Sequence, residues 1–256
     1  MSNVSNQGGC GACYAFAAVG AIEGAVALHG SNQRQKVVPL SVQQVVDCSA
    51  AEGNMGCRAG SMTSTYNYTV MDKGLDTAAA YPFIGKASGA CAFAPSSVGG
   101  RISGWHQVSG STDGTAPVNV SNIERAVGTL GPVAVGIDAN SQLMQFYHGG
   151  FYAGNCTFTG GPSGFKICMG DCGRTAKDLN HAVLLVGYAD EPAGTDSCPG
   201  GNYMPGNNCP YWLVKNSWGE GWGEQGGYFK MYRSSDPSDA ESNICGFALD
   251  ANMPVV

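Results

Sequence analysis

Charged side chains are scarce in this sequence. Asp, Glu, Lys and Arg make up 12% of its 256 residues, and the formal net charge is -6. No run of lysines or arginines is present that could neutralise a phosphate backbone, so nucleic-acid binding is disfavoured. The longest apolar stretch, AFAAVGAIEGAVAL, is interrupted by Glu23 and by glycines. It falls short of the roughly 20 apolar residues that cross a bilayer, so we expect no membrane span.

An internal repeat and a signal peptide are also absent. The polar start MSNVSNQ has neither a basic segment nor an apolar centre, so we expect the sequence to be a processed or trimmed form. Hydrophobic residues make up 43% of the chain, enough to bury a sizeable core. The length then predicts one large domain or two halves that share a cleft.

Cysteine, in contrast, is abundant, with eleven residues in the chain. Such a number is typical of a disulfide framework and predicts a secretory or endo-lysosomal compartment. The tripeptides that begin at Asn3, Asn67 and Asn119 fit the N-glycosylation pattern of a glycoprotein. Because the count is odd, five disulfides leave one thiol free, and a free thiol in an oxidising compartment is a candidate for chemistry.

The first hundred residues are expected to be mostly helical. Apolar residues recur at helical spacing from Cys13 to the turn-forming Gly30-Ser31-Asn32. A second helix is predicted after Ser41, which can cap it while Gln44 returns the bond as a capping box. A third is expected over about residues 61–73.

Strands dominate the second part of the sequence. Segments rich in β-branched and aromatic residues predict strands, and one short helix is expected at about 121–130. The predicted strands are 133–137, 181–189, 211–218 and 227–233, and two stretches, roughly 157–178 and 190–210, are expected to be surface insertions. Helices followed by strands predict an α+β protein with two segregated halves.

The stretch NQGGCGACYAF, residues 6–16, holds two cysteines three positions apart. It can be a redox or zinc pair, a pair of structural half-cystines, or a disulfide at Cys10 beside a nucleophile at Cys13. No partner motif for a redox or metal site is visible. The last reading is favoured because free amides and the helix dipole at a helix start favour a thiolate.

Histidine is rare, and only one of the four is well placed for proton transfer. His181 opens an apolar strand in DLNHAVLLVGY, whereas His29, His106 and His148 have settings typical of structural or solvent-facing side chains. Asn216 lies beside tryptophans in KNSWGEGWGEQGGYF. An amide shielded by indoles can hold an imidazole in one tautomer.

Together these motifs resemble the papain-like cysteine peptidases. The run Cys10-Gly11-Ala12-Cys13-Tyr14 matches the signature C-G-[SA]-C-[WY] of that family. Further similar segments follow in the family's order over nearly the whole chain: LSVQQVVDC, GCRAGSM, YPF, GPVAVGIDA, HGGFYAG, LNHAVLLVGY, KNSWGEGWGEQGGYF and NICGFALDANMPVV.

The resemblance implies a papain-like α+β fold of two domains with the active site in the cleft between them. Residues 1–105 would form the mainly helical left domain. Residues 106–256 would form a mainly β, antiparallel and barrel-like right domain, whose C-terminal tail crosses back to the left domain.

The resemblance also assigns roles to individual residues. Cys13 would be the nucleophile and His181 its partner in a thiolate-imidazolium pair, oriented by Asn216. Gln7 would donate to the oxyanion hole together with the backbone N–H of Cys13. Trp218 would shield the bond between the imidazole and the amide from water.

The substrate cleft is expected to bind a peptide as an extra strand along the backbone of Gly60. The second subsite would be walled by small or apolar residues that suit Leu, Val or Phe at P2, with Asn180 beside it in place of the usual Asp. Asp250 would lie at its floor, where it can pair with a substrate Arg, unless it turns to solvent. The wall residues are Met62, Gly136, Leu179 and Ala182.

The family's disulfide pattern implies three bonds, and the two insertions supply two more. The family bonds would be Cys10 with Cys57, Cys48 with Cys91, and Cys156 with Cys245; the extra bonds would be Cys198 with Cys209 and Cys168 with Cys172. Alternatively, Cys172-Gly173 resembles the family's Cys-Gly before the histidine, so that Cys172 would replace Cys156 as the partner of Cys245. Either pattern leaves Cys13 free.

In function, the resemblance implies a monomeric lysosomal, vacuolar or secreted endopeptidase that needs no metal or organic cofactor. Its partners would be peptide or protein substrates, its own propeptide and cystatin-like inhibitors. Two alternatives remain open: a non-catalytic binding protein on the same fold, and a peptide ligase or transamidase, since an amine can intercept the same thioester.

Overall fold

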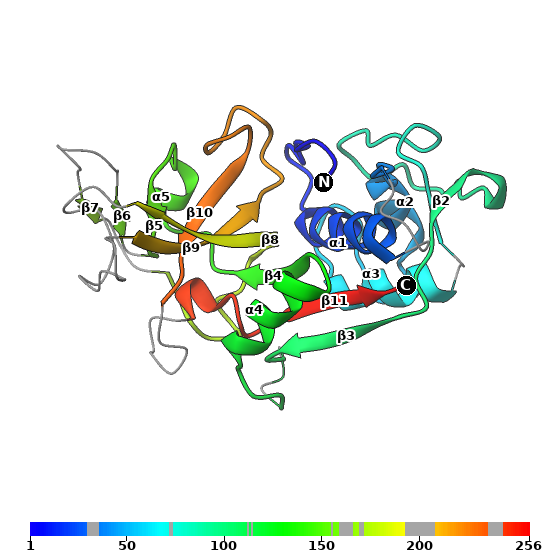
Figure 1. The fold of residues 1–256 in the computed structure, drawn as a ribbon. Coiled ribbons are helices and arrows are strands. Elements are labelled where there is room, and N and C mark those ends of the chain that lie inside the picture. Colours follow the sequence, from blue (N-terminus) through cyan, green and yellow to red (C-terminus); the bar gives the residue numbers. More distant parts are fainter. Residues whose placement is uncertain are drawn as a thin grey trace.

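The computed structural model describes residues 1–29, 36–71, 74–111, 113, 115–154, 156–158, 166–168, 172–192, 208–234 and 243–256. Helices α1 to α3 gather at one side of the molecule, and strands β8, β9 and β10 lie at the other (Figure 1). The N-terminal residues lie above α1, and the C-terminus ends beside the helices (Figure 1). This is an α+β arrangement, as the sequence predicts.

Three helices build the first part of the chain. The predicted first and third helices are confirmed, and a two-stranded antiparallel sheet follows them. The elements are α1 (Cys13–His29), α2 (Val42–Cys48), α3 (Met62–Met71), β1 (Leu75–Asp76), η1 (Pro95–Ser97) and β2 (Val98–Gly100). α1 is buried on almost every face, because nearly all its residues are apolar or small.

The start of α2 differs in part from the prediction. Ser41 caps it, since its side chain accepts a hydrogen bond from the backbone N–H of Gln44 at 2.9 Å. Gln44 does not return the bond. Its side chain instead donates to the Tyr68 hydroxyl and accepts from the N–H of Asp76, while the N–H of Ser41 donates to the Asp76 carbonyl. The capping box is therefore wrong, because long-range partners use the Gln44 amide.

A nine-stranded sheet organises the second part, with the order β3-β11-β4-β8-β9-β10-β5-β6-β7. Neighbouring strands are antiparallel except β10 and β5. The elements are β3 (Gly104–Ser109), α4 (Val120–Thr129), β4 (Val133–Ile137), α5 (Gln142–Gln145), β5 (Phe151–Tyr152), β6 (Cys156–Phe158), β7 (Lys166–Cys168), β8 (His181–Pro192), β9 (Asn208–Lys215), β10 (Tyr228–Tyr232), η3 (Ile244–Gly246) and β11 (Ala251–Val255).

All four predicted strands are present, and one of them ends earlier than expected. β9 stops at Lys215 and not at residue 218. The N–H of Asn216 still donates to the Gly227 carbonyl, and the N–H of Ser217 donates to the Asn216 side chain, which is buried. The end of this strand thus delivers Asn216 to the interior.

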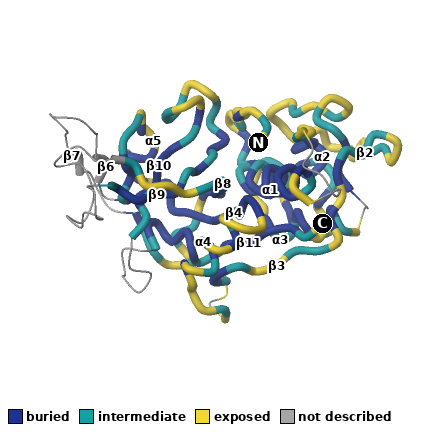
Figure 2. Tube along the Cα trace, in the orientation of Figure 1, coloured by how far each residue is buried: buried dark blue, intermediate teal, exposed yellow. Residues whose placement is uncertain are grey.

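Two hydrophobic cores meet at β4 and β8, which contribute residues to both. One surrounds Trp212 inside the sheet, and the other surrounds α1 and includes Ala182 and Leu184 of β8. α1 approaches the sheet closely, because a Cβ at Gly24 would lie 2.5 Å from the Pro132 ring. Figure 2 shows α1 and β4 as largely buried where the helical and strand-rich sides join. The predicted domain boundary at residues 105 and 106 stays a prediction.

The disulfides follow the second of the two patterns proposed from the sequence. Cys10 is bonded to Cys57 and Cys48 to Cys91. Cys172 is bonded to Cys245, so the bonds Cys156–Cys245 and Cys168–Cys172 are wrong. The backbone register of β6 and β7 sets Cys156 opposite Cys168. Cys209 forms a disulfide, but its predicted partner Cys198 lies outside the described residues.

Candidate active site

Cys13 is the first residue of α1, and the chain before it is firmly anchored. The Cys10–Cys57 disulfide links this segment to the loop between α2 and α3. The N–H of Gly11 donates to the Cys57 carbonyl at 2.9 Å. A side chain at Gly11 would clash, since its Cβ would lie 2.8 Å from that carbonyl oxygen. Cys13 is a free thiol of intermediate exposure. The helix start is therefore fixed in position with its thiol accessible.

His181 begins β8, Asn216 directly follows the adjacent β9, and their side chains bond to each other. The distance from His181 Nε2 to Asn216 Oδ1 is 2.8 Å. Asn216 Oδ1 also accepts the N–H of Ser217 at 2.8 Å, which identifies this atom as the amide oxygen. An amide oxygen can only accept, so Nε2 of His181 must carry a proton. In the neutral ring, Nδ1 is then the basic nitrogen.

Two tryptophans extend from His181, one packed on the other. The Trp218 ring lies 4.8 Å from the His181 ring, centroid to centroid, and Trp222 packs edge-on against Trp218 at 5.0 Å. Nε1 of Trp222 donates to the carbonyls of Met144 and Gln145 at the end of α5. His181 itself is only 8% exposed.

Gln7 is held by three hydrogen bonds besides the one that its carbonyl accepts from the N–H of Cys10. Its N–H donates to the Ser217 carbonyl, its Oε1 accepts the Ser217 hydroxyl at 2.7 Å, and its Nε2 donates to the Cys10 carbonyl at 3.0 Å. An amide nitrogen carries two protons, so the second proton of Nε2 remains available to a ligand. Ser217 was not singled out from the sequence, although it lies between two residues that were.

A cavity of about 400 Å³ brings the predicted site residues together. It is lined by ten of the twelve residues proposed for catalysis or substrate binding: Gln7, Cys13, Gly60, Met62, Gly136, Leu179, Asn180, His181, Ala182 and Asp250. Trp218 lines an adjacent cavity of about 410 Å³, shared with Gln7 and His181. Asn216 lines neither cavity; it lies behind His181. The sequence analysis did not single out Arg58 and Ala176, which also line the first cavity.

Two glycines keep this cavity open. A Cβ at Gly60 would lie 2.5 Å from both the Tyr14 ring and Asn54 Oδ1, so no larger residue fits there. A Cβ at Gly136 would lie 3.2 Å from Leu179 and 3.5 Å from the Cβ of Asp250. The missing side chain at Gly136 therefore leaves space directly beside Asp250.

Asp250 is half-buried in the wall of the cavity. Its Oδ1 accepts a hydrogen bond from the Asn252 side chain at 2.7 Å. Burial raises the pKa of Asp250, while hydrogen bonds from Asn252 and Gln107 act in the opposite direction. Burial raises the pKa of the nearby Tyr66 hydroxyl, and the charge of Asp250 raises it further.

Asn180 is fixed on both sides of its amide. Its Oδ1 accepts the N–H of Ala139, and its Nδ2 donates to Asp138 Oδ1 at 2.5 Å. Asp138 also accepts the N–H of Gly173. Asp138 could not be found from the sequence, because nothing near it in the chain links it to Asn180.

Burial opposes charge on both members of the predicted pair. It raises the pKa of Cys13, although hydrogen bonds from the backbone at Ala182, Tyr14 and Cys13 itself lower it. It lowers the pKa of His181 to about 4, against the effect of the Asn216 hydrogen bond. The expected stabilisation of the thiolate by the helix start is therefore smaller than the desolvation of the thiol. The contact with Ala182 also places the Cys13 sulfur beside the backbone that follows His181.

Neither a metal site nor a membrane-spanning helix is found among the described residues. Among the described residues, no group of three His, Cys, Asp or Glu side chains is arranged to hold a metal ion. In the same part of the chain, no helix is both long and apolar enough to cross a bilayer.

The sequence model described as papain family cysteine protease matches residues 1–255. The chain belongs to the papain family. It is 38% identical to cathepsin J of Rattus norvegicus over 255 residues, and 37% identical to procathepsin L of Mus musculus over 257 residues. These alignments cover 99% and 100% of this chain but 62% of each relative, so the chain spans less than two thirds of their length.

Solved structures show the same fold in proforms of the family. Procathepsin L 3 from the larval midgut of Tenebrio molitor superposes with a TM-score of 0.74 and 34% identity, covering all of this chain and 67% of that one. The ragweed allergen Amb a 11, a cysteine protease solved in its proform, gives 0.73 and 33%, covering 62% of its chain. The papain-like α+β fold expected from the motifs is thus confirmed.

Proposed function

We propose that the chain is a cysteine endopeptidase in which Cys13 is the nucleophile and His181 the proton carrier. One observation carries the proposal: the 2.8 Å hydrogen bond from His181 Nε2 to Asn216 Oδ1 leaves Nδ1 as the basic nitrogen. Cys13 and His181 line the same cavity, and the cysteine sulfur contacts the backbone of the next residue, Ala182. A nucleophile, a base and an orienting group are the parts that covalent catalysis requires.

The two groups become reactive as a pair. Alone, each is held neutral by burial, since the pKa of Cys13 is raised and that of His181 is lowered. Transfer of the thiol proton to Nδ1 creates two adjacent opposite charges, each of which stabilises the other. The resulting thiolate-imidazolium pair supplies both a nucleophile and an acid.

In the reaction, the Cys13 thiolate attacks the peptide carbonyl carbon and forms a C–S bond. The C–N bond then breaks as His181 donates its Nδ1 proton to the leaving amine, which gives a thioester and a free amino terminus. His181 next takes a proton from water, the hydroxide displaces the sulfur, and the acid product leaves. Asn216 keeps the imidazole oriented through both steps.

The negative charge on the carbonyl oxygen needs donors that are already in place. The free Nε2 proton of Gln7 and the backbone N–H of Cys13 at the start of α1 can supply them. Because three hydrogen bonds fix Gln7, its side chain need not reorganise during the reaction. This preorganisation is the source of its expected effect on rate.

The experiment that tests this function is digestion of an internally quenched peptide, with and without an added amine nucleophile. Cleavage to an acid and an amine supports the peptidase. If most turnovers instead transfer the acyl group to the added amine, the chain is a transamidase. Binding of the peptide without cleavage would identify a non-catalytic binding protein on this fold.

The second subsite is proposed to accept apolar and basic residues at P2. Met62 and Leu179 give it apolar walls, and the absent side chain at Gly136 leaves room for a long substrate side chain. Asp250 lines the same space and is positioned by Asn252. A carboxylate at the end of an apolar pocket can bind a guanidinium through two hydrogen bonds.

Replacement of Asp250 by Asn is expected to lower kcat/KM for a substrate with Arg at P2 by about 30-fold or more, because loss of a buried charge partner costs at least about 2 kcal/mol. A matched substrate with Phe at P2 should change little. Because burial raises the pKa of Asp250, protonation begins at a higher pH than for an ordinary Asp, and the preference for Arg should fall as the pH drops through that range. Kinetics on the two substrates between about pH 4 and 7 measure both effects. An unchanged ratio in the variant would contradict the assignment.

The biological setting is proposed from the cysteines and the relatives. Three described disulfides suit an oxidising lysosomal, vacuolar or secretory compartment. Mouse procathepsin L is named as a proform, and two solved relatives are procathepsins or a proform. We therefore expect a monomer that acts on peptides or proteins and is restrained by its own propeptide and by cystatin-like inhibitors.

A further inference from the structure

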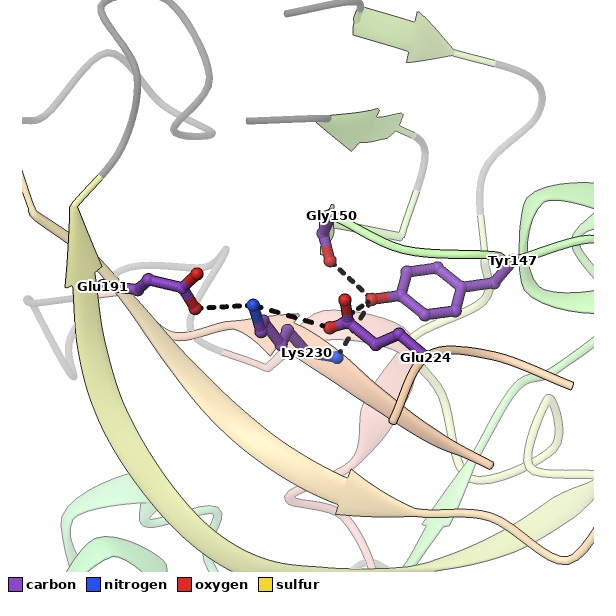
Figure 3. Close-up of polar contacts among 5 residues, drawn as sticks. All are labelled: Tyr147, Gly150, Glu191, Glu224 and Lys230. Atoms are coloured by element: carbon purple, nitrogen blue, oxygen red, sulfur yellow. Dashed lines mark hydrogen bonds and ion pairs between the residues drawn. The ribbon is translucent and has the colours of Figure 1, made fainter. Parts of the chain in front are cut away.

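A group of charges around the buried Lys230 lies on the side of the tryptophans, and its member Glu191 has a side chain that is 44% exposed. Lys230 of β10 bonds to Glu191 of β8 at 2.5 Å and lies 3.7 Å from Glu224, in the turn before β10. Tyr147, which follows α5, points its hydroxyl at the Glu224 carboxylate. Figure 3 shows the Lys230 ammonium between the two glutamates. We call Tyr147, Glu191, Glu224 and Lys230 the Lys230 cluster.

The cluster is shielded from water on several sides. The side chain of Lys230 is 10% exposed and that of Glu224 is 20% exposed. The ammonium also lies 5.6 Å from the Phe151 ring and 5.4 Å from the Tyr211 ring. Because an unpaired charge in such a place is costly, Glu224 is held where it can pair with Lys230.

Tyr147 links Glu224 to the backbone. Its hydroxyl lies 2.5 Å from the Gly150 carbonyl and 3.1 Å from Glu224 Oε1, and it accepts the N–H of Lys230. These contacts are drawn in Figure 3. Burial raises the pKa of Glu224, whereas Lys230 and Tyr147 act against it. The single hydroxyl proton can serve either the carbonyl or the carboxylate, so the three groups are fixed together.

A continuous stack of rings joins this cluster to the imidazole. The ring of Tyr147 lies 5.7 Å from Trp222, Trp222 lies 5.0 Å from Trp218, and Trp218 lies 4.8 Å from His181. Both tryptophans and Glu224 belong to the same loop, residues 216–227. The position of the indoles over His181 therefore depends on how this loop is held.

Near its end the loop is also held by Nε1 of Trp222, which donates to the carbonyls of Met144 and Gln145. Positive φ angles at Gly223, Gln225, Gly226 and Gly227 make the turn sharp, and the backbone of Glu224 pairs with Tyr228. The loop contains two charged side chains, Glu224 and Glu220, and Glu220 is exposed. Among the described residues, Glu224 is thus the charged side chain that ties the loop to β10.

We propose that Glu224 and Tyr147 are positioning residues for His181, which hold Trp222 and Trp218 against the imidazole. They do not touch the substrate. The inference rests on the proposed function only for its effect on turnover. Its physical core, the shielding of His181 from water, can be measured without catalysis.

The variants compare the same chemical change at two places in one loop. Glu224→Gln removes one of the two carboxylates that pair with Lys230, and Glu220→Gln makes the same change at an exposed position. Tyr147→Phe keeps the ring stack but removes the three hydroxyl contacts, and it guards against a Glu224 variant that fails to fold. None of these changes alters the titratable side chains that line the cavity with His181: Cys13, Tyr14, Arg58 and Asp250.

The first measurement is the titration of His181 by NMR with Cys13 blocked as its methyl disulfide. In the unaltered chain, burial holds the pKa of His181 at about 4. In Glu224→Gln and Tyr147→Phe, water reaches the ring and the pKa should rise by about half a unit or more, while Glu220→Gln leaves it unchanged. The second is kcat, expected to fall about tenfold to a hundredfold in the first two variants with KM changed less than twofold.

Lower melting temperatures in Glu224→Gln and Tyr147→Phe, with a His181 titration like that of Glu220→Gln, would overturn the proposal and leave the cluster a merely structural one. If the unaltered chain cleaves no peptide, the proposed function fails, whereas the shift in the His181 titration still decides the positioning role.

Discussion

Replacement of Cys13 by Ala is expected to lower kcat/KM for peptide hydrolysis by about 10⁵- to 10⁶-fold. Loss of the nucleophile removes the covalent route entirely, and nucleophile deletions in hydrolases of this type of mechanism have effects of that order. The thiol takes part in no disulfide, so the fold should be retained. Assays with a fluorogenic peptide, together with thermal unfolding of both proteins, measure the two effects.

Control experiments must separate loss of chemistry from loss of binding. The Cys13→Ala chain should still bind an uncleaved peptide, because the backbone of Gly60 and the walls of the cavity are unchanged. Hydrolysis within about a hundredfold of the unaltered rate would show that another group attacks the carbonyl. The assignment of Cys13 would then be wrong.

The second large effect is expected at Gln7. Gln7→Ala should lower kcat about 10²- to 10³-fold with a much smaller change in KM, because the amide stabilises charge that develops only in the transition state. Ser217→Ala should have a smaller effect, about tenfold, since it removes one of the three hydrogen bonds that position Gln7. Steady-state kinetics on one substrate give both ratios.

If Gln7→Ala raised KM as much as it lowered kcat, this interpretation would be contradicted. A higher KM with an unchanged kcat would mean that Gln7 binds the substrate and its transition state equally. A Ser217→Ala variant as impaired as Gln7→Ala would instead show that the serine has a role of its own in the cavity.

Much of the site could be predicted from short stretches of the sequence. The start of α1 at Cys13 follows from apolar spacing, and His181 from its place at the head of an apolar strand. The odd number of cysteines indicated one free thiol. Bringing these residues into one cavity required the resemblance to a known family, because nothing local in the sequence links residue 13 to residue 181.

The predictions that failed concern side chains whose partners are distant in the chain. Gln44 can cap its own helix, but in the structure its amide bonds to Tyr68 and Asp76. The partner of Cys245 could not be chosen between Cys156 and Cys172 by spacing, and the fold selects Cys172. In each case local preference leaves several outcomes open, and tertiary contacts decide.

The pKa of Cys13 is likewise not determined by the local sequence alone. The sequence predicts a helix start, whose amides favour the thiolate, and these contacts are present. Burial by the sheet has the larger effect and raises the pKa of Cys13. The depth of the cleft cannot be read from residues 6–16. The proposed reactivity of Cys13 therefore depends on its pairing with His181.

This conclusion is tested most directly by the rate at which iodoacetamide alkylates Cys13 as a function of pH, with the adduct mapped by mass spectrometry. At about pH 6, where an ordinary thiol of pKa about 8.5 is almost wholly protonated, we predict rapid labelling at Cys13 alone in the unaltered chain. In His181→Ala, labelling at that pH should be lost, and reactivity should return only above the ordinary thiol pKa, because burial raises the pKa of an unpaired Cys13. Labelling in the unaltered chain that follows a single titration at or above about pH 8.5, unaffected by His181→Ala, would contradict the activated pair.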